Sequence, residues 1–251
     1  MQHRAITPKR NSPRFHGFGQ RVDAPELLDE RDIDEQLLRR NLLDIRGVNR
    51  FFGGTSAILR NVPQIVVHLP VDQTIRILDL ATGAADIPLA VSRWATSAGR
   101  RVSICASDVS PQILDVAREV AGQDAAIAFS IEDARAVGMP DRSFDVVLTS
   151  LSLHHFSRQD AVSVLREMDR LSTAGFIVND LRRSRFAFLA TWVASRIATK
   201  NPLTRHDAPL SVRRSFTPAE LAGLLHEAGV SNVQVAKQPW FRMVAVQVKP
   251  E

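Results

Sequence analysis

A turn of small residues at positions 79–86 is the segment of this sequence best suited to hold a reactive ligand. It follows an apolar, β-branched run and carries small side chains at alternate positions, Ala81, Gly83 and Ala85. Small side chains let a ligand lie against the backbone, and Gly83 can adopt a φ angle that other residues disfavour. A turn that only packs a helix onto a strand would have the same composition, so the turn alone leaves both readings open.

Two carboxylates, Asp79 and Asp86, bracket this turn and discriminate between ligand classes. Dinucleotide-binding turns follow G-x-G-x-x-G and leave a bare helix N-terminus facing the pyrophosphate. Positions 81, 83 and 86 are Ala, Gly and Asp, and the Asp86 carboxylate would repel a pyrophosphate. Both acids suit a cofactor that carries an ammonium and a sulfonium, so a nicotinamide-dependent oxidoreductase is disfavoured.

Further acids follow the next two predicted strands, at 102–108 and 126–130. Asp108 ends the first of them and can accept hydrogen bonds from both hydroxyls of a ribose. Asp133 follows the second, where its carboxylate can accept from an adenine amino group while the Ala134 amide donates to the ring. A helix-capping Asp108 and a turn Asp133 are the structural alternatives.

The acids named above lie in or next to predicted strands, so the arrangement of the strands decides where they are placed. Strands and helices alternate along the chain from residue 74 to residue 229. Such alternation predicts right-handed crossovers and an α/β fold with a doubly wound, mostly parallel sheet. Ligands then lie at the carboxyl ends of the strands. Strands are predicted at 75–80, 102–108, 126–130, 143–150 and 175–180, helices at 86–98, from 110, at 157–171 and at 217–229, and a closing hairpin at 233–236 and 243–248.

The remaining segments are predicted to cover the site. Residues 1–22 read as a flexible basic arm, and 23–69 as a helical lid with helices at 32–48 and 55–67. The segment 181–216 reads as an insertion, a helical stretch followed by a polar loop. Residues 70–251, which contain the predicted strands and this insertion, are predicted to form the main domain.

Composition narrows the function classes. The chain has 251 residues, 45% hydrophobic and 24% charged, with Cys105 as its one cysteine, so neither global disorder nor an intrachain disulfide is expected. No apolar run approaches the roughly 20 residues of a transmembrane helix, and a cytoplasmic protein is expected. The formal net charge is +5, but 28 of the 32 basic residues are scattered arginines, which makes a nucleic-acid partner unlikely.

These motifs, in this order, resemble those of class I S-adenosylmethionine-dependent methyltransferases. The resemblance covers roughly residues 70–250 and includes the run Phe-Asp-Val-Val at 144–147. The segment 151–156 looks like the loop after the fourth strand in quinone-biosynthesis methyltransferases and related small-molecule enzymes. The resemblance implies a Rossmann-like sheet of seven strands with an antiparallel last strand.

The resemblance also implies contacts to the cofactor. Asp79, Ala81 and Gly83 would surround the methionine part. Asp108 and Val109 would hold the ribose, Asp133 and Ala134 the adenine, and Ser150 would line the pocket. The sequence departs from the family at Ala81 and Ala85, which replace the first and third loop glycines, and at 172–175, which replace Pro-Gly-Gly.

Two adjacent histidines, His154 and His155, are the candidates for the catalytic base. They follow the fourth strand, and an imidazole with an ordinary pKa near 6.5 is an efficient proton acceptor at neutral pH. The structural alternative is a buried, hydrogen-bonded histidine that stabilises the loop.

Phe52, with other aromatic residues, would contact an apolar acceptor, although packing within the lid explains these residues equally well. His206 is a second candidate for the base on the acceptor side. Arg205, Arg213 or Arg214 would bind an anionic acceptor, although a solvated surface is the simpler interpretation of each arginine.

The sequence therefore predicts a methyltransferase that uses S-adenosylmethionine, leaves S-adenosylhomocysteine, and methylates O or C of a small, largely apolar acceptor. Phenolic, polyketide-like and quinone-like acceptors fit. No cluster has metal-ligand spacing, so no metal is expected. An RNA methyltransferase and a non-catalytic cofactor-binding scaffold remain as alternatives, and a homodimer is left open.

Overall fold

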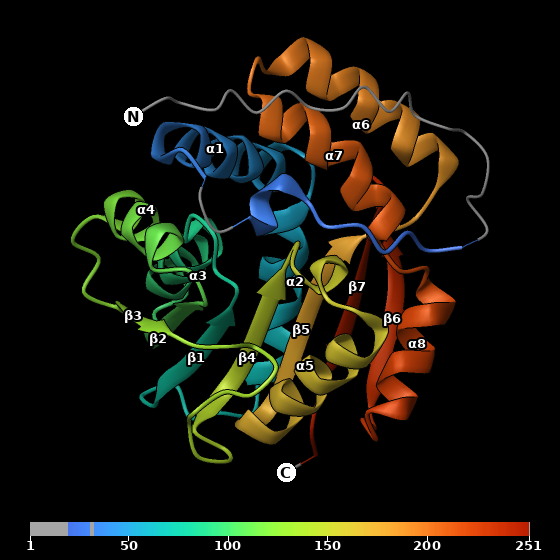
Figure 1. Cartoon of the computed structure of the whole chain (residues 1–251). Helices are drawn as coiled ribbons and strands as arrows, with labels where there is room; N and C mark the ends of the chain where they lie inside the picture. The colour runs from blue at the N-terminus through green and yellow to red at the C-terminus, as the bar shows by residue number, and fades with distance from the viewer. Residues whose placement is uncertain (1–19, 31–32, 251) are drawn as a thin grey trace.

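A seven-stranded sheet organises the protein (Figure 1). The computed structural model describes residues 20–30 and 33–250, so nearly all of the predicted arm at 1–22 lies outside the described residues. The strands lie in the order β3-β2-β1-β4-β5-β7-β6. Their bounds are β1 Thr74–Leu80, β2 Arg101–Asp108, β3 Ile127–Ile131, β4 Phe144–Ser150, β5 Ser172–Leu181, β6 Val233–Gln238 and β7 Arg242–Gln247.

The first five strands pair in parallel, whereas β7 runs antiparallel to both β5 and β6. The predicted doubly wound sheet with an antiparallel last strand is therefore confirmed. The chain order reverses between β1 and β4, and ligands of such sheets bind at this switch point, outside the carboxyl ends of the strands.

Helices cover both faces of the sheet, because the strands are apolar on both sides. α5 (Arg158–Leu171) and α8 (Pro218–Glu227) pack on one face, where Leu78, Val147 and Phe176 are buried. α2 (Gly54–Val66) and α3 (Asp86–Ser97) pack on the other, over Ile77 and Val146. α4 (Pro111–Ala121) packs beside α3 against β2 and β3.

The structure assigns the second predicted lid helix, α2, to the core. Its side chains Ile58, Val62 and Ile65 are fully buried in the cluster that covers β1, β4 and β5. Burial of three such side chains contributes several kcal/mol, roughly 1.5–3 kcal/mol each. α2 is thus part of the sheet's helical layer, and the covering elements lie elsewhere.

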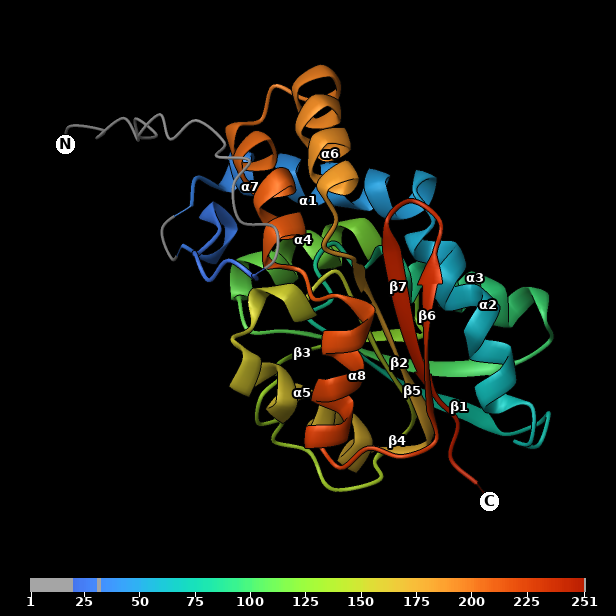
Figure 2. The same ribbon diagram turned by 90° about the vertical axis from the view of Figure 1, so that its right-hand side faces the viewer.

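The covering elements gather at the carboxyl end of the parallel strands (Figures 1 and 2). They are the short 3₁₀ turn η1 (Leu27–Asp29), α1 (Glu35–Phe51), α6 (Arg185–Ala198) and α7 (Pro202–Arg214). The described helices include none that is long and apolar enough to cross a membrane.

The polar loop predicted within 181–216 is wrong, because this segment forms α7. Asn201 caps the helix by accepting from the Leu203 amide at 3.0 Å, and Pro202 occupies the first helical position, where no amide is needed. Pro209 lies inside the helix, although proline lacks an amide hydrogen and its ring disfavours a helix interior. Asp207 ties α7 to η1 by accepting from the amides of Leu27 and Leu28 at 2.9 and 3.0 Å, respectively.

Candidate active site

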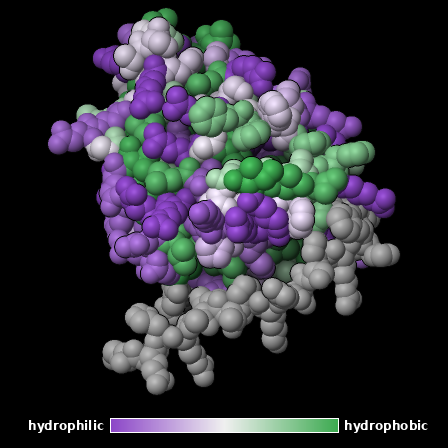
Figure 3. Space-filling view, turned by 90° about the horizontal axis from the view of Figure 1, so that it is seen from above, coloured by the Kyte–Doolittle hydropathy of each residue, from purple (hydrophilic) through white to green (hydrophobic). Residues whose placement is uncertain are grey.

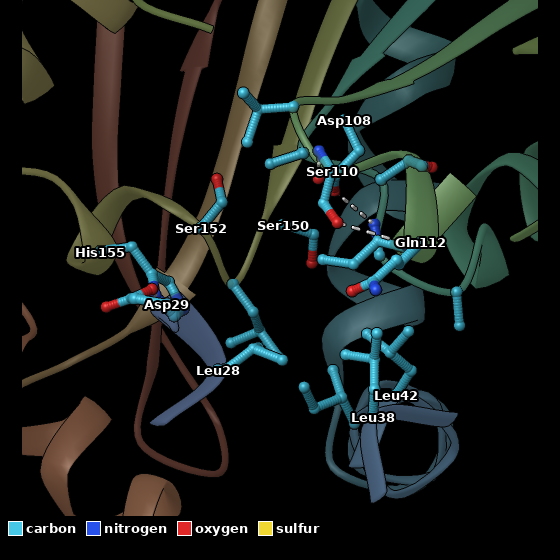
Figure 4. A pocket seen from close by; sticks show the side chains of 18 of the residues that line it. Leu28, Asp29, Leu38, Leu42, Asp108, Ser110, Gln112, Ser150, Ser152 and His155 are labelled. Carbon is cyan, nitrogen blue, oxygen red and sulfur yellow. Dashed lines mark hydrogen bonds and ion pairs between the residues drawn. The ribbon is translucent and has the colours of Figure 1, made fainter. Parts of the chain in front are cut away.

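A cavity of about 980 Å³ lies at the switch point between β1 and β4. Figure 4 shows Asp108, Ser110 and Gln112 on one side of it, and Asp29 beside His155 on the other. Apolar side chains of η1 and α1 close it, including Leu28, Leu38 and Leu42. The cavity therefore joins a polar region, an ionisable pair and an apolar wall.

The turn from β1 to α3 forms the floor of the polar region. Ala81, Gly83 and Ala85 have φ angles of 54°, 54° and 53°, so two alanines adopt the left-handed conformation that favours glycine. The Thr82 amide donates to the Ser107 carbonyl at 2.8 Å, which fixes the turn against β2. The turn thus keeps a glycine-like path although the sequence replaces two family glycines with alanine.

Three acids gather around this turn, and burial raises the pKa of each. Burial raises the pKa of Asp79 to about 8, partly offset by the Thr82 hydroxyl, which donates to it at 2.7 Å. Burial raises the pKa of Asp86 to about 6, partly offset by a hydrogen bond from Asn49. Asp108 is 6% exposed, and burial raises its pKa although the amides of Gly83 and Ser110 donate to it.

Two oxygen atoms in this cluster are orphaned. Asp79 Oδ1 and Asp86 Oδ2 are buried without a hydrogen-bond partner among the described residues, and both side chains line the cavity. Unpaired buried acceptors with raised pKa values are the complement of a cationic ligand with hydrogen-bond donors. The site therefore fits the ammonium and the sulfonium of S-adenosylmethionine.

The raised pKa values of Asp79 and Asp86 predict how the stability of the free protein depends on pH. A carboxyl group whose folded-state pKa is raised contributes stability below its unfolded pKa, and this is lost as the pH rises through the folded value. Melting temperature should therefore fall between about pH 5 and pH 8, by the equivalent of a few kcal/mol. Thermal denaturation of the wild type and of Asp79→Asn across this range checks this. The variant should show a shallower fall, and identical curves would contradict the assignment to Asp79.

A buried arginine, Arg242, links the acid cluster to α1. Its Nε donates to the Phe52 carbonyl at 2.7 Å, and its Nη2 donates to Asn49 Oδ1 at 3.1 Å. Burial lowers the pKa of Arg242 to about 10, and the charges of Asp180 and Asp86 partly offset this. Arg242 thereby holds the C-terminal end of α1 beside the cofactor region.

His154 is held inside the protein by Asp180. The turn η2 (Leu153–His155) follows β4, and His154 is 3% exposed. Its Nδ1 lies 2.6 Å from Asp180 Oδ1, and its backbone amide donates to Asp180 Oδ2 at 2.9 Å. His154 does not line the cavity, so this geometry favours the structural alternative for it.

His155, by contrast, lines the cavity and pairs with Asp29 of η1. Its Nδ1 lies 2.8 Å from Asp29 Oδ1, and its Nε2 lies 3.7 Å from Glu26 Oε2. Burial lowers the pKa of His155, but the charges of Glu26 and Asp29 outweigh burial and raise it overall. Burial also acts on Asp29, whose pKa is nevertheless held far below its usual range by His155 and Arg214.

Arg214 fastens this pair to α7. It is 4% exposed, donates to Asp29 Oδ2 at 2.8 Å and to the His155 carbonyl at 2.6 Å, and its Nε lies 3.8 Å from Glu26 Oε1. Glu26, His154 and His155 bring possible metal-ligand atoms within 4.8 Å of one another. The Arg214 guanidinium, 3.8 Å from Glu26 Oε1, already balances part of the negative charge there.

The structure brings most of the predicted cofactor residues together. Asp79, Ala81, Gly83, Asp108, Val109 and Ser150 all line the cavity. Asp133 and Ala134 do not. The Asp133 carboxylate is paired with Arg135 at 2.6 Å, and Ala134 is buried in the core. Arg135 itself lines the cavity, so the adenine contacts predicted for its two neighbours stay a prediction.

Three predicted acceptor residues lie away from the cavity. Phe52 packs edge-on against Trp240 with ring centroids 5.4 Å apart. Arg205 donates to the carbonyls of Thr199 and Arg196 within the α6–α7 segment. His206, whose hydrogen bond to Asp207 raises its pKa, faces η1 from α7. Their contacts give each a structural role.

Several residues of the site could not be found from the sequence. Glu26, Asp29, Asn49 and Arg242 act only through contacts with distant segments, and no local motif marks them. Asp180 did carry a signal, because it lies near the end of β5 at the edge of the sheet where the other acids gather.

Comparison with known proteins supports the assignment from fold and site. Residues 77–175 match a family model described as a methyltransferase domain. The chain is 38% identical over 101 residues to a demethylmenaquinone methyltransferase of Deinococcus radiodurans, covering 40% of this chain and only 39% of that protein. It is 27% identical over 172 residues to the ubiquinone/menaquinone biosynthesis C-methyltransferase UbiE of Cupriavidus necator, covering 63% of this chain and 68% of that protein.

Solved structures agree on the fold. A methyltransferase from Aquifex aeolicus described as SAM-dependent superposes with a TM-score of 0.56 at 14% identity, over 86% of this chain and 98% of that one. Human N-acetylserotonin methyltransferase in complex with SAM gives 0.63 at 16% identity, over 87% and 57% of the two chains. The sheet order and these structures show that the chain has the fold of S-adenosylmethionine-dependent methyltransferases, and residues 77–175 match the methyltransferase domain within it.

Proposed function

We propose that this enzyme transfers a methyl group to O or C of a small, largely apolar acceptor of phenolic, polyketide-like or quinone-like type. One observation carries the proposal. The His155–Asp29 pair stands on the wall of the cavity that also contains the acid cluster and the apolar side chains of η1 and α1. The names of the quinone-biosynthesis relatives are consistent with such an acceptor.

The apolar wall would hold the acceptor. Leu28, Ile33, Leu38, Leu42 and Ile45 line the cavity on the side of η1 and α1. These side chains bind a ring or an alkyl chain by excluding water, and a site that excludes water also strengthens charge interactions inside it. The acceptor would then be aligned for in-line transfer, and alignment supplies much of the rate.

The acids and His155 would supply the remaining chemistry. When bound, S-adenosylmethionine supplies a methyl group on a positively charged sulfur, which needs a nucleophile and no further activation. Asp79 and Asp86 balance the positive charge. Asp29 accepts the hydrogen on His155 Nδ1, which leaves Nε2 to take the hydroxyl proton of a phenol or quinol. The resulting phenolate is nucleophilic at oxygen and at the ortho carbon. Methylation at oxygen needs only this one proton transfer, whereas methylation at carbon also needs loss of the proton on the methylated ring carbon, which restores the aromatic ring.

A panel of acceptors with isotopically labelled S-adenosylmethionine tests this proposal. Alkyl phenols, quinols and resorcinols should accept label, and bulk RNA should not. Label in RNA alone would establish the RNA methyltransferase instead. Micromolar binding of S-adenosylhomocysteine without turnover on any acceptor would favour the non-catalytic scaffold.

A further inference from the structure

α6 carries an exposed apolar face that the cavity does not use. Phe186, Leu189, Val193 and Ile197 are 78%, 47%, 40% and 82% exposed, and we call them the apolar ridge. Their spacing of three, four and four residues puts them on one side of the helix. A surface helix normally turns such a face toward the core, so this one is built to meet something outside the described chain.

The segment that carries the apolar ridge contains basic residues and no acids, and one of its arginines, Arg183, is buried in an ion pair with Glu220. The segment 181–206 contains five arginines and one lysine, and no aspartate or glutamate. Arg185 and Arg196 are exposed on α6 itself, and Lys200 follows its end. Figure 3, which looks down on this end of the molecule, shows apolar patches with hydrophilic side chains between and around them.

An aromatic patch lies at the same end of the molecule. Phe51 ends α1, Phe52 follows it, and Trp240 lies in the turn between β6 and β7. They are 69%, 43% and 58% exposed. Since β6 runs parallel to β5, this turn lies at the carboxyl end of the sheet, as α6 does. Trp and Phe with exposed rings are typical of proteins that rest at a membrane–water interface.

We propose that α6 docks the enzyme onto an anionic lipid bilayer, with the apolar ridge inserted among the acyl chains and the basic side chains at the lipid phosphates. α6 has 14 residues and is roughly 21 Å long, so it would lie in the plane of the membrane. Anionic lipid complements a basic face that lacks acids. A second copy of the chain does not, because an isologous contact would oppose the same basic residues.

The benefit of membrane docking rests on the proposed function, because it assumes an apolar acceptor. The experiment that tests docking does not depend on that acceptor. The apolar ridge and the cavity lie at the same end of the sheet, with α1 and α7 between them (Figure 2). An apolar acceptor dissolved in a bilayer would thus be collected near the cavity without crossing bulk water.

Co-sedimentation with vesicles tests the proposal, using the full chain and no acceptor. Vesicles of equal parts phosphatidylcholine and phosphatidylglycerol should bind the wild type, and pure phosphatidylcholine should bind it about tenfold or more weakly. The double variant Leu189→Glu, Val193→Glu should lose binding to the mixed vesicles, again by about tenfold or more. Arg185→Gln with Lys200→Gln should weaken binding and flatten its dependence on salt.

A matched control distinguishes binding through the apolar ridge from nonspecific binding of vesicles by any exposed apolar side chain. Val67 and Val71 are 77% and 70% exposed at the opposite end of the sheet, just before β1. Val67→Glu with Val71→Glu should bind vesicles like the wild type. Unchanged melting temperature and unchanged binding of S-adenosylhomocysteine in each variant show that the fold and the cofactor site are intact.

Other outcomes overturn the proposal. Failure of the wild type to bind mixed vesicles, or equal loss in the control variant, would exclude a bilayer. A concentration-dependent dimer that the α6 variant abolishes would identify the apolar ridge as a self-association surface. Vesicle binding without turnover on any acceptor would leave the docking surface standing and remove the proposed function.

Discussion

Replacing Asp108 with alanine is expected to weaken binding of S-adenosylhomocysteine by about a hundredfold or more, while the free protein keeps or gains stability. The proposed role of Asp108 is to accept hydrogen bonds from the ribose, and two bonds to a charged acceptor are worth roughly 3–6 kcal/mol. In the free protein, however, Asp108 is 6% exposed, and burial raises its pKa. Replacing it removes the desolvation cost of a buried carboxyl group, which outweighs the hydrogen bonds from the Gly83 and Ser110 amides, so affinity and stability should move in opposite directions.

Calorimetric titration and thermal denaturation together measure both effects. Asp115 is a matched control, because it lies on the neighbouring helix α4 with a side chain that is 73% exposed. Asp115→Ala should bind S-adenosylhomocysteine like the wild type. An unchanged dissociation constant in Asp108→Ala would remove the ribose assignment.

Replacing His155 with alanine is expected to lower kcat by about a hundredfold or more, with affinity for S-adenosylhomocysteine within a few-fold of the wild type. Loss of a proton acceptor typically costs this much, and Asp108 of the acid cluster lies on the other side of the cavity (Figure 4). The base must be neutral, and Glu26 and Asp29 outweigh burial and the charge of Arg214 to raise the pKa of His155. Wild-type activity should therefore rise with pH, and the midpoint of the rise should lie above the ordinary histidine value of about pH 6.5.

The pH profile of kcat separates a base from a merely structural histidine. The His155→Ala variant should lose the rise as well as the rate. His226, exposed on α8, offers a control whose replacement by alanine should leave both unchanged. A variant with full activity, or with low activity and an unaltered pH profile, would exclude His155 as the base.

Local patterns were sufficient to predict the sheet and the cofactor turn. The alternation of short apolar strands with capped helices is visible within a few residues, as at Ser110 and Pro111, which begin α4 as predicted. The turn after β1 was also recognisable, since its small residues and flanking acids are contiguous. Left-handed φ angles at Ala81 and Ala85 explain how the turn tolerates alanine, at a cost of roughly 1–2 kcal/mol each.

Contacts between distant segments could not be predicted in the same way. Asp29 meets His155 across 126 residues, and Arg214 meets Asp29 across 185. No sequence pattern around either residue of these pairs indicates which distant residue it contacts. The assignment of α2 to a lid differed from the structure for a related reason. An amphipathic helix shows which of its faces is apolar, and not whether that face meets the sheet or a substrate.

The position of β7 has a consequence for how the protein is made. β7 is the last described strand in the chain, yet it lies between β5 and β6. During synthesis one edge of the apolar strand β5 therefore stays unpaired until β7 has been made. Unpaired strand edges can form hydrogen bonds with other chains and so promote aggregation. Arg242, which begins β7, reaches Asn49 and the neighbourhood of Asp86 only when this strand is in place. A ribosome-bound chain would thus carry every residue of the cofactor turn before Arg242 joins Arg46 in balancing the charge of Asp86.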